Sequence, residues 1–260
     1  MSLAVRQTES IRLNGVLSRL KSRARRLQLS ASEGIGLAAA ATASQMGLTR
    51  VVRRIAKGQP AFEPFSHTAT NLIWFGAPAV AAMVASKRRG SGNPVRDLGL
   101  TPKFSDVLII PALVQLAGLL ASAGSAYVSS KLNAKASETI TPEPSLARLP
   151  GPPTRLVGLM APLTEEVIHR GLLMSGLEAV MPRPAATLAQ AAIFGFLHSG
   201  LIQRVGFNPL PTVQAGAVAL SLGAGVQVTG RLFPSVITHA ALNLIGERQM
   251  RRSANQVRED

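Results

Sequence analysis

The sequence predicts an all-α fold, a polytopic bundle of six to eight transmembrane helices. Apolar residues make up 47% of the 260 residues and charged residues only 16%, which is a low charged fraction for a soluble globular chain. Long apolar stretches alternate with short clusters of Lys and Arg, which is the pattern of membrane spans separated by loops. Water is therefore not expected to be the main solvent of this chain.

The positive charge has two readings, nucleic-acid binding and membrane contact. A net charge of +15 would suggest phosphate binding in a soluble protein. However, one Trp and one Tyr leave little aromatic surface for stacking on bases, and cations beside apolar runs suit anionic lipid headgroups. We therefore predict the lipid bilayer as a partner and no nucleic acid. The absence of Cys excludes disulfides, thiolate metal ligands and a cysteine nucleophile.

Residues 1–31 are predicted to form a basic N-terminal arm. Cationic residues run through this segment, with Glu9 as its only acid, whereas a secretory signal peptide has its charges before an apolar core. A basic arm on the membrane surface fits this pattern, and an Arg-rich organellar transit peptide is the alternative. The expected location is the membrane of a bacterial cell or, in the alternative, an organellar membrane.

Residues 32–130 are predicted to contain the N-terminal transmembrane helices. A span needs about 20 helical residues. The segment 34–48 is Ala-rich and short, and 69–86 is a better candidate despite Pro78, since membrane helices tolerate proline. The segment 107–129 is the clearest span of the chain.

A polar, Pro-rich loop is expected over 131–154, and the predicted catalytic core follows over 155–247. Proline residues separate this core into four apolar helices. A charged C-terminal tail is expected over 248–260. The four helices are expected at 155–181, 185–202, 211–230 and 233–246.

Ionisable side chains are rare in the core and are costly at membrane depth unless they are paired or face water. Glu166 and Arg170 are four residues apart, so they share a helix face and can form an ion pair, while Glu165 can point elsewhere. An interfacial helix with solvated charges would explain the same pattern.

Two further helices carry isolated polar residues. His198 follows Phe194 by one turn, and His239 and Asn243 share one face of an apolar helix. Taken alone, His198 would be a capping or packing residue, and the second pair an interhelical hydrogen-bonding pair. If the three segments converge, a glutamate can take a proton from water, an imidazole can assist, and an imidazole with an amide can stabilise an oxyanion.

The three motifs resemble those of the CPBP family (CAAX proteases and bacteriocin-processing enzymes) of intramembrane glutamic peptidases. They read Glu-Glu-x-x-x-Arg at 165–170, Phe-x-x-x-His at 194–198 and His-x-x-x-Asn at 239–243. The resemblance extends to Gly171 and to the Leu-Gly-Leu element at 98–100, and it covers about 95–247. His169 departs from the family pattern, which more often has an aromatic residue there; it would fill that slot or tune Glu165.

The resemblance implies a role for each motif residue. Glu165 would be the general base with His198 assisting, and His239 with Asn243 would form the oxyanion site. Glu166, Arg170 and Phe194 would support them. No cofactor is expected, with zinc held by Glu165, His198 and His239 as the alternative.

The expected function is therefore endopeptidase cleavage of a membrane-associated or hydrophobic peptide or protein substrate, prenylated substrates being among those that the family cleaves. The alternatives are a catalytically silent scaffold or bacteriocin-immunity-type protein, and a small transporter with a Glu and His proton relay.

Overall fold

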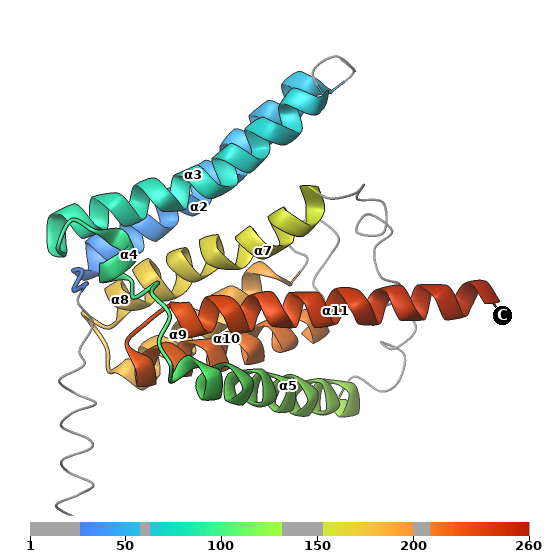
Figure 1. Ribbon diagram of the computed structural model, residues 1–260. Helices are drawn as coiled ribbons and strands as arrows, with labels where there is room; N and C mark the ends of the chain where they lie inside the picture. The colour runs from blue at the N-terminus through green and yellow to red at the C-terminus, as the bar shows by residue number, and fades with distance from the viewer. Residues whose placement is uncertain (1–26, 58–62, 132–152, 200–208, 260) are drawn as a thin grey trace, which may run out of the picture.

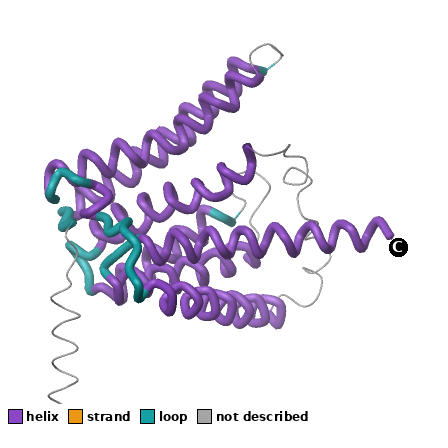
Figure 2. Tube along the Cα trace, in the orientation of Figure 1, coloured by secondary structure: helices purple, strands orange, loops and turns teal. Residues whose placement is uncertain are grey.

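The structure is a computed structural model that describes residues 27–57, 63–131, 153–199 and 209–259. Every regular element in these ranges is a helix (Figures 1 and 2). The predicted all-α helical bundle is confirmed. The elements are α2 (Ala31–Ala56), α3 (Glu63–Arg89), α4 (Pro94–Asp97), α5 (Asp106–Lys131), α7 (Pro153–Glu166), the π-helix η3 (Val167–Leu173), α8 (Met174–Leu177), α9 (Arg183–Leu197), α10 (Pro209–Thr229) and α11 (Phe233–Glu259).

Each predicted span corresponds to a helix, but some bounds differ. Helix α2 is longer than the expected 34–48 because the Ser30 hydroxyl and the Glu33 carboxylate cap its start and the helix continues through the basic residues to Ala56. Helix α9 ends at Leu197 instead of 202, and a turn follows at His198 and Ser199. The charged tail expected after 247 continues α11 as a helix to Glu259. Most of the basic arm and of the Pro-rich loop lies outside the described residues.

Two of the described helices, α5 and α10, are both long and apolar enough to cross a membrane. The apolar part of α11, Phe233–Gly246, is shorter. In the most apolar window of α5 only 11% of the residues are buried inside the protein. Exposed apolar surface of this extent is typical of a helix that faces lipid or another protein.

Close approach between helix backbones joins the N-terminal helix pair to the rest of the bundle. Helices α2 and α3 lie side by side as a hairpin that diverges from the other helices (Figure 1), and α2 crosses η3 and α8. At this crossing Gly34 and Gly176 face each other, and a Cβ on Gly34 would lie 2.5 Å from the Cα of Gly176. Small residues at such contacts are typical of helix packing in membranes.

The second half of the bundle uses the same kind of contact. Helix α10 packs against α5, α9 and α11. A Cβ on Gly195 of α9 would lie 2.5 Å from the Thr212 carbonyl oxygen and 3.2 Å from the Cα of Gly216 in α10. The α9 motif segment is therefore fixed against α10 by direct backbone contact.

The Leu-Gly-Leu element ties the first half of the chain to the start of α11. The Leu98 carbonyl accepts a hydrogen bond from the Leu232 N–H at 3.0 Å, and the Gly99 carbonyl accepts one from Phe233 at 3.2 Å. Gly99 has a φ of +62° and its Cα lies against Arg231, so a side chain there would be strained and crowded. Arg231 in turn pairs with Asp106 at the start of α5.

A buried carboxylate closes the turn between α3 and α4. Asp97 accepts hydrogen bonds from the Ser86 hydroxyl and from the backbone N–H and hydroxyl of Ser91. Burial acts to raise the pKa of Asp97, but these hydrogen bonds outweigh it and the net pKa lies below the usual 3.8. The turn is therefore built around an ionised aspartate.

Candidate active site

The two neighbouring glutamates stand at the junction of two helix types. Glu165 and Glu166 end α7, and the π-helix η3 begins at Val167. The backbone N–H of Met174 donates to the carbonyl of His169, five residues earlier, which is the hydrogen bond of a π-helix. Short π segments are frequent at functional sites, and the sequence pattern had predicted an uninterrupted α-helix here.

The predicted ion pair between Glu166 and Arg170 is present. Arg170 Nη1 donates to Glu166 Oε1 at 2.9 Å, and both side chains are fully buried. Removing two charges from solvent is costly unless they are paired. The pair therefore fixes the start of η3 from inside the bundle.

His239 of α11 joins this pair and reaches the second glutamate. Its Nδ1 donates to Glu166 Oε1 at 2.9 Å, although the two residues are 73 positions apart in the sequence. Its Nε2 lies 3.6 Å from Glu165 Oε2. The imidazole thus lies between the two carboxylates, with Glu165 the more accessible of them at 26% side-chain exposure.

Phe194 of α9 lies at the centre of the cluster. The His198 ring stacks on it at 4.4 Å between centroids, and the His169 and His239 rings meet it edge to face at 5.0 and 6.1 Å. The Arg170 guanidinium lies 4.6 Å from the ring centroid, a cation–π contact. His169 therefore makes the aromatic packing contact that its position in the motif suggested.

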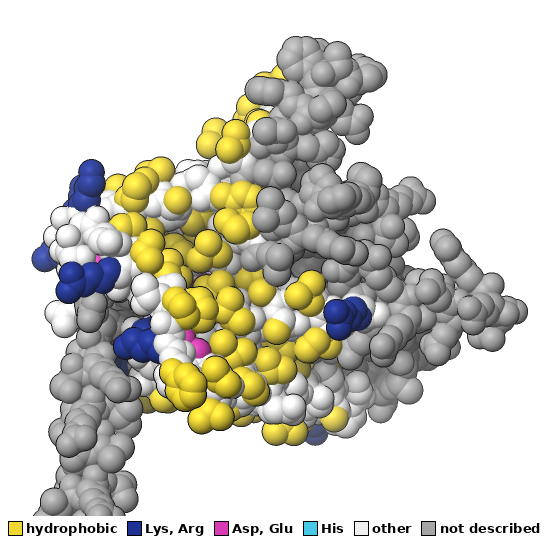
Figure 3. Space-filling view, viewed as in Figure 1, with side chains coloured by type: hydrophobic (Ala, Val, Ile, Leu, Met, Phe, Trp, Pro, Cys, Tyr) yellow, Lys and Arg dark blue, Asp and Glu magenta, His cyan; other side chains and the backbone are white. Residues whose placement is uncertain are grey.

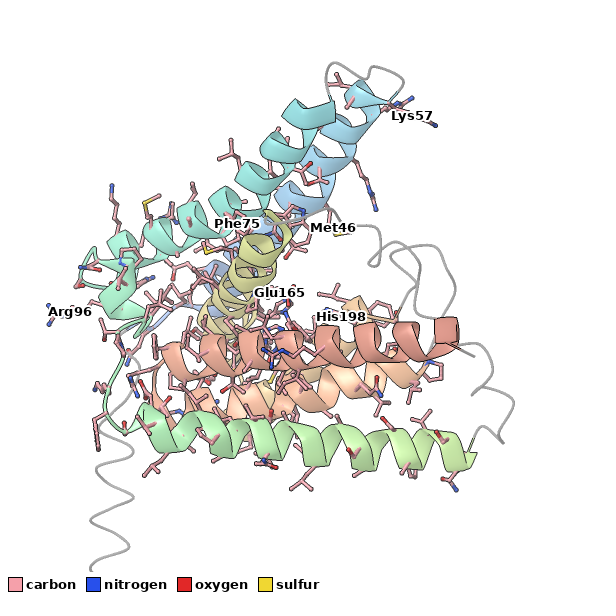
Figure 4. The ribbon with its side chains drawn as sticks, turned by 45° about the vertical axis from the view of Figure 1, so that its right-hand side comes forward. Met46, Lys57, Phe75, Arg96, Glu165 and His198 are labelled. Carbon is pink, nitrogen blue, oxygen red and sulfur yellow. The ribbon has the colours of Figure 1, made fainter. Side chains whose placement is uncertain are left out.

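His198 caps the end of α9. Its Nδ1 lies 2.8 Å from the Phe194 carbonyl oxygen, and because a carbonyl can only accept, this nitrogen carries a proton. In the neutral ring Nε2 then has the free lone pair. The side chain is exposed, so this lone pair is available to water or substrate; Figure 4 shows Glu165 and His198 in the region between α7 and α11.

Asn243 lies one turn beyond His239 on α11 and is exposed. The structure thus brings six of the seven predicted site residues into one connected cluster, and Asn243 lies at its border on the same helix as His239. The six are Glu165, Glu166, Arg170, Phe194, His198 and His239.

The zinc alternative has little support from this geometry. Within the described ranges no group of three or more His, Asp or Glu residues could hold a metal ion. His239 uses Nδ1 to bind Glu166 and turns Nε2 toward Glu165.

One buried polar residue of this region was absent from the sequence expectations. Gln190 lies one turn before Phe194 on α9 and is fully buried. A glutamine inside an apolar helix is itself a signal of a polar contact, and this signal would have found it. Gln214 and Gln227, in contrast, contact neighbouring helices through Ser125 and through Glu178 with Thr187.

An all-helical chain with apolar spans and a buried Glu, Arg and His cluster between its helices belongs to the class of integral membrane proteins with an interior polar site. Residues 152–245 match the family profile described as type II CAAX prenyl endopeptidase Rce1-like. This match supports the resemblance to the CPBP peptidases, and the matched range includes every residue of the three motifs. Searches of curated proteins and of solved structures gave no match.

Proposed function

We propose that the protein hydrolyses peptide bonds of a membrane-associated or hydrophobic substrate with water activated by Glu165. The observation that carries this proposal is the contact of His239 with both glutamates, at 2.9 Å to Glu166 and 3.6 Å to Glu165. Glu166 is occupied by Arg170 and His239, whereas Glu165 is partly exposed. Glu165 is therefore the carboxylate available to a water molecule.

In the proposed reaction Glu165 takes a proton from water while the water oxygen attacks the carbonyl carbon of the scissile peptide. The resulting oxyanion is stabilised by the Asn243 amide and by Nε2 of His239, which can donate when the ring carries its second proton. Collapse of the intermediate breaks the C–N bond, and Glu165 returns the proton to the leaving amine. His198 assists by holding the water through the lone pair of Nε2. No metal or other cofactor takes part.

The substrate chemistry is proposed from the family and the surroundings. The family profile is that of CAAX prenyl endopeptidases, which makes a prenylated peptide the first substrate to test. The exposed apolar helices suit a substrate that comes from the bilayer. The expected host is a bacterial cell membrane.

The test measures cleavage by the purified protein in detergent, with an internally quenched peptide that carries a farnesylated Cys four residues from its C-terminus, and with the same peptide unmodified. Glu165→Gln and His198→Ala are compared with the native chain, with and without a chelator, and Glu33→Gln, at the start of α2 where the carboxylate pairs with Arg89 outside the cluster, is the control. We expect cleavage to fall about 10²- to 10⁴-fold in Glu165→Gln, to fall in His198→Ala, and to survive chelation. Cleavage that survives Glu165→Gln would overturn the assignment, and cleavage of neither peptide would favour a silent scaffold.

A further inference from the structure

A second group of polar side chains lies inside the bundle, at the end where α8 leads into α9. Gln227 of α10 donates to Glu178 Oε1 at 2.6 Å and to the Thr187 hydroxyl at 3.0 Å. Thr187 is buried and contacts the sulfur of Met174 at 3.7 Å. Glu178 and Gln227 are half-buried, so this group begins near the surface and continues into the interior.

Gln190 continues the polar group along α9. Thr187, Gln190 and Met174 all surround Gly223 of α10, because a Cβ on this glycine would lie 2.7 Å from Thr187 Cγ2, 3.5 Å from Gln190 Oε1 and 3.7 Å from Met174 Sδ. Gln190 is fully buried, and neither Oε1 nor Nε2 has a hydrogen-bond partner among the described residues. The carboxamide is therefore a buried donor and acceptor without protein partners.

The candidate active site presents unpartnered atoms of its own. Phe194 lies one turn after Gln190 on α9, and the Arg170 guanidinium lies over its ring. Arg170 uses Nη1 to bind Glu166, while Nε and Nη2 are buried and, within the described ranges, have no partner. Oε2 of Glu166 is likewise buried and has no hydrogen-bond partner among the described residues.

Leaving such groups unsatisfied costs free energy, and the cost is larger for charged groups. Proteins meet this cost with buried water that makes about three hydrogen bonds to otherwise unpaired polar atoms. The Arg170 guanidinium, which lies over the Phe194 ring, and the Gln190 carboxamide, one turn before Phe194 on α9, supply both the donors and the acceptor that such a water needs.

We propose that Gln190 and Arg170 hold internal water between them, and that this water connects the Glu178, Gln227 and Thr187 group to the Arg170, Glu166 and His239 cluster. The connected groups form a route by which water reaches the interior of the bundle from the α8–α9 end. The role of this route in the reaction rests on the proposed function, because a hydrolase surrounded by lipid must admit water. Gln190 is then a positioning residue that acts through Arg170.

The first test detects the water without any substrate. Brief X-ray radiolysis of the purified protein in detergent generates hydroxyl radicals from bound water, and mass spectrometry measures methionine oxidation. Met174 is fully buried, so oxidation there reports internal water, and the exposed Met83 reports the dose. We expect rapid oxidation of Met174 in the native chain and a several-fold loss in Gln190→Leu, whose apolar side chain would displace the water. Oxidation of Met174 that is absent, or equal in the two chains, would overturn the proposal.

The second test uses the cleavage assay. Gln190→Leu should lower kcat about tenfold or more with little change in KM, and Gln190→Asn, which keeps the carboxamide, should restore part of it. Ser221→Ala is the control, because this hydroxyl is buried but bonded to the carbonyl of Val218 in its own helix. If Gln190 is only structural, Gln190→Leu should instead leave kcat unchanged and keep or raise the melting temperature. If the native chain cleaves nothing, the peptidase proposal fails while the radiolysis result still decides on the water.

Discussion

Glu165 and Glu166 are adjacent in the sequence, yet their surroundings differ. Glu166 is fully buried and binds Arg170 and His239, whereas Glu165 is partly exposed and lies 3.6 Å from His239. The four-residue spacing was enough to predict the pairing of Glu166 with Arg170. The contact with His239 could not be predicted, because it depends on how α11 packs against α7.

This difference predicts that removing the charge of Glu166 lowers the stability of the protein, whereas removing the charge of Glu165 lowers its activity. Glu166→Gln leaves the buried Arg170 guanidinium without its counter-charge, so the protein should lose about 3–5 kcal/mol of stability. Glu165→Gln should keep the melting temperature close to the native value while it abolishes cleavage. Thermal unfolding of both variants in detergent, followed by tryptophan fluorescence or circular dichroism, measures the difference. Equal melting temperatures for the two variants would contradict the structural role of Glu166.

At the scale of elements, hydrophobic length and proline positions predicted where each helix lies, while the ends and the internal geometry differed. The π-helix η3 was not anticipated, since nothing in its composition distinguishes it from an α-helix. It follows from packing, because Gly171 within it lies close to Leu98 and Leu232, 3.1 and 3.4 Å from where a Cβ would stand. Neighbours from two other segments thus crowd the turn that carries Arg170.

The glycine crossing of α2 and α8 gives a prediction with a control in the same helix. Gly34→Ala would bring a methyl group 2.5 Å from the Cα of Gly176, so α2 must move away and the protein should lose about 1–3 kcal/mol. Gly36→Ala, two residues on, meets nothing within 4 Å and should be neutral or stabilise the helix by up to about 1 kcal/mol. Melting temperatures of the two variants in the same detergent compare them directly. A loss of similar size in both would mean that the close contact is unimportant.

At the scale of the whole molecule, the distribution of side chains is that of a protein in a bilayer. Apolar side chains cover the middle of the face seen in Figure 3, and Lys and Arg gather at the end formed by α3, α4 and the start of α5. The exposed cations of this end are Lys87, Arg88, Arg89, Arg96 and Lys103. Such an apolar belt beside a basic end suits hydrocarbon next to anionic headgroups.

Helix α5 tests this arrangement. Leu119, in the middle of the helix, and Val107, near its start, are 68% and 66% exposed, so neither supports the protein core. Leu119→Arg should cost about 2.5–3.5 kcal/mol of membrane insertion, whereas Val107→Arg should cost much less because its charge can reach the headgroups. The fraction of each variant recovered in washed membranes measures this. Equal recovery of both would argue against α5 as a span.

The sequence by itself determined the helical class and the position of each long helix, and it singled out the candidate site residues, because apolar length, proline and rare polar residues are local signals. The tertiary structure decided which of these residues meet. His239 reaches Glu166 and Phe194 only because α11, α7 and α9 pack together, and Gln190 stands out because packing buries it with no hydrogen-bond partner among the described residues. The physical reason is that contacts between distant segments depend on the relative placement of whole helices, and backbone contacts such as those of Gly34 with Gly176 and Gly195 with Gly216 fix that placement.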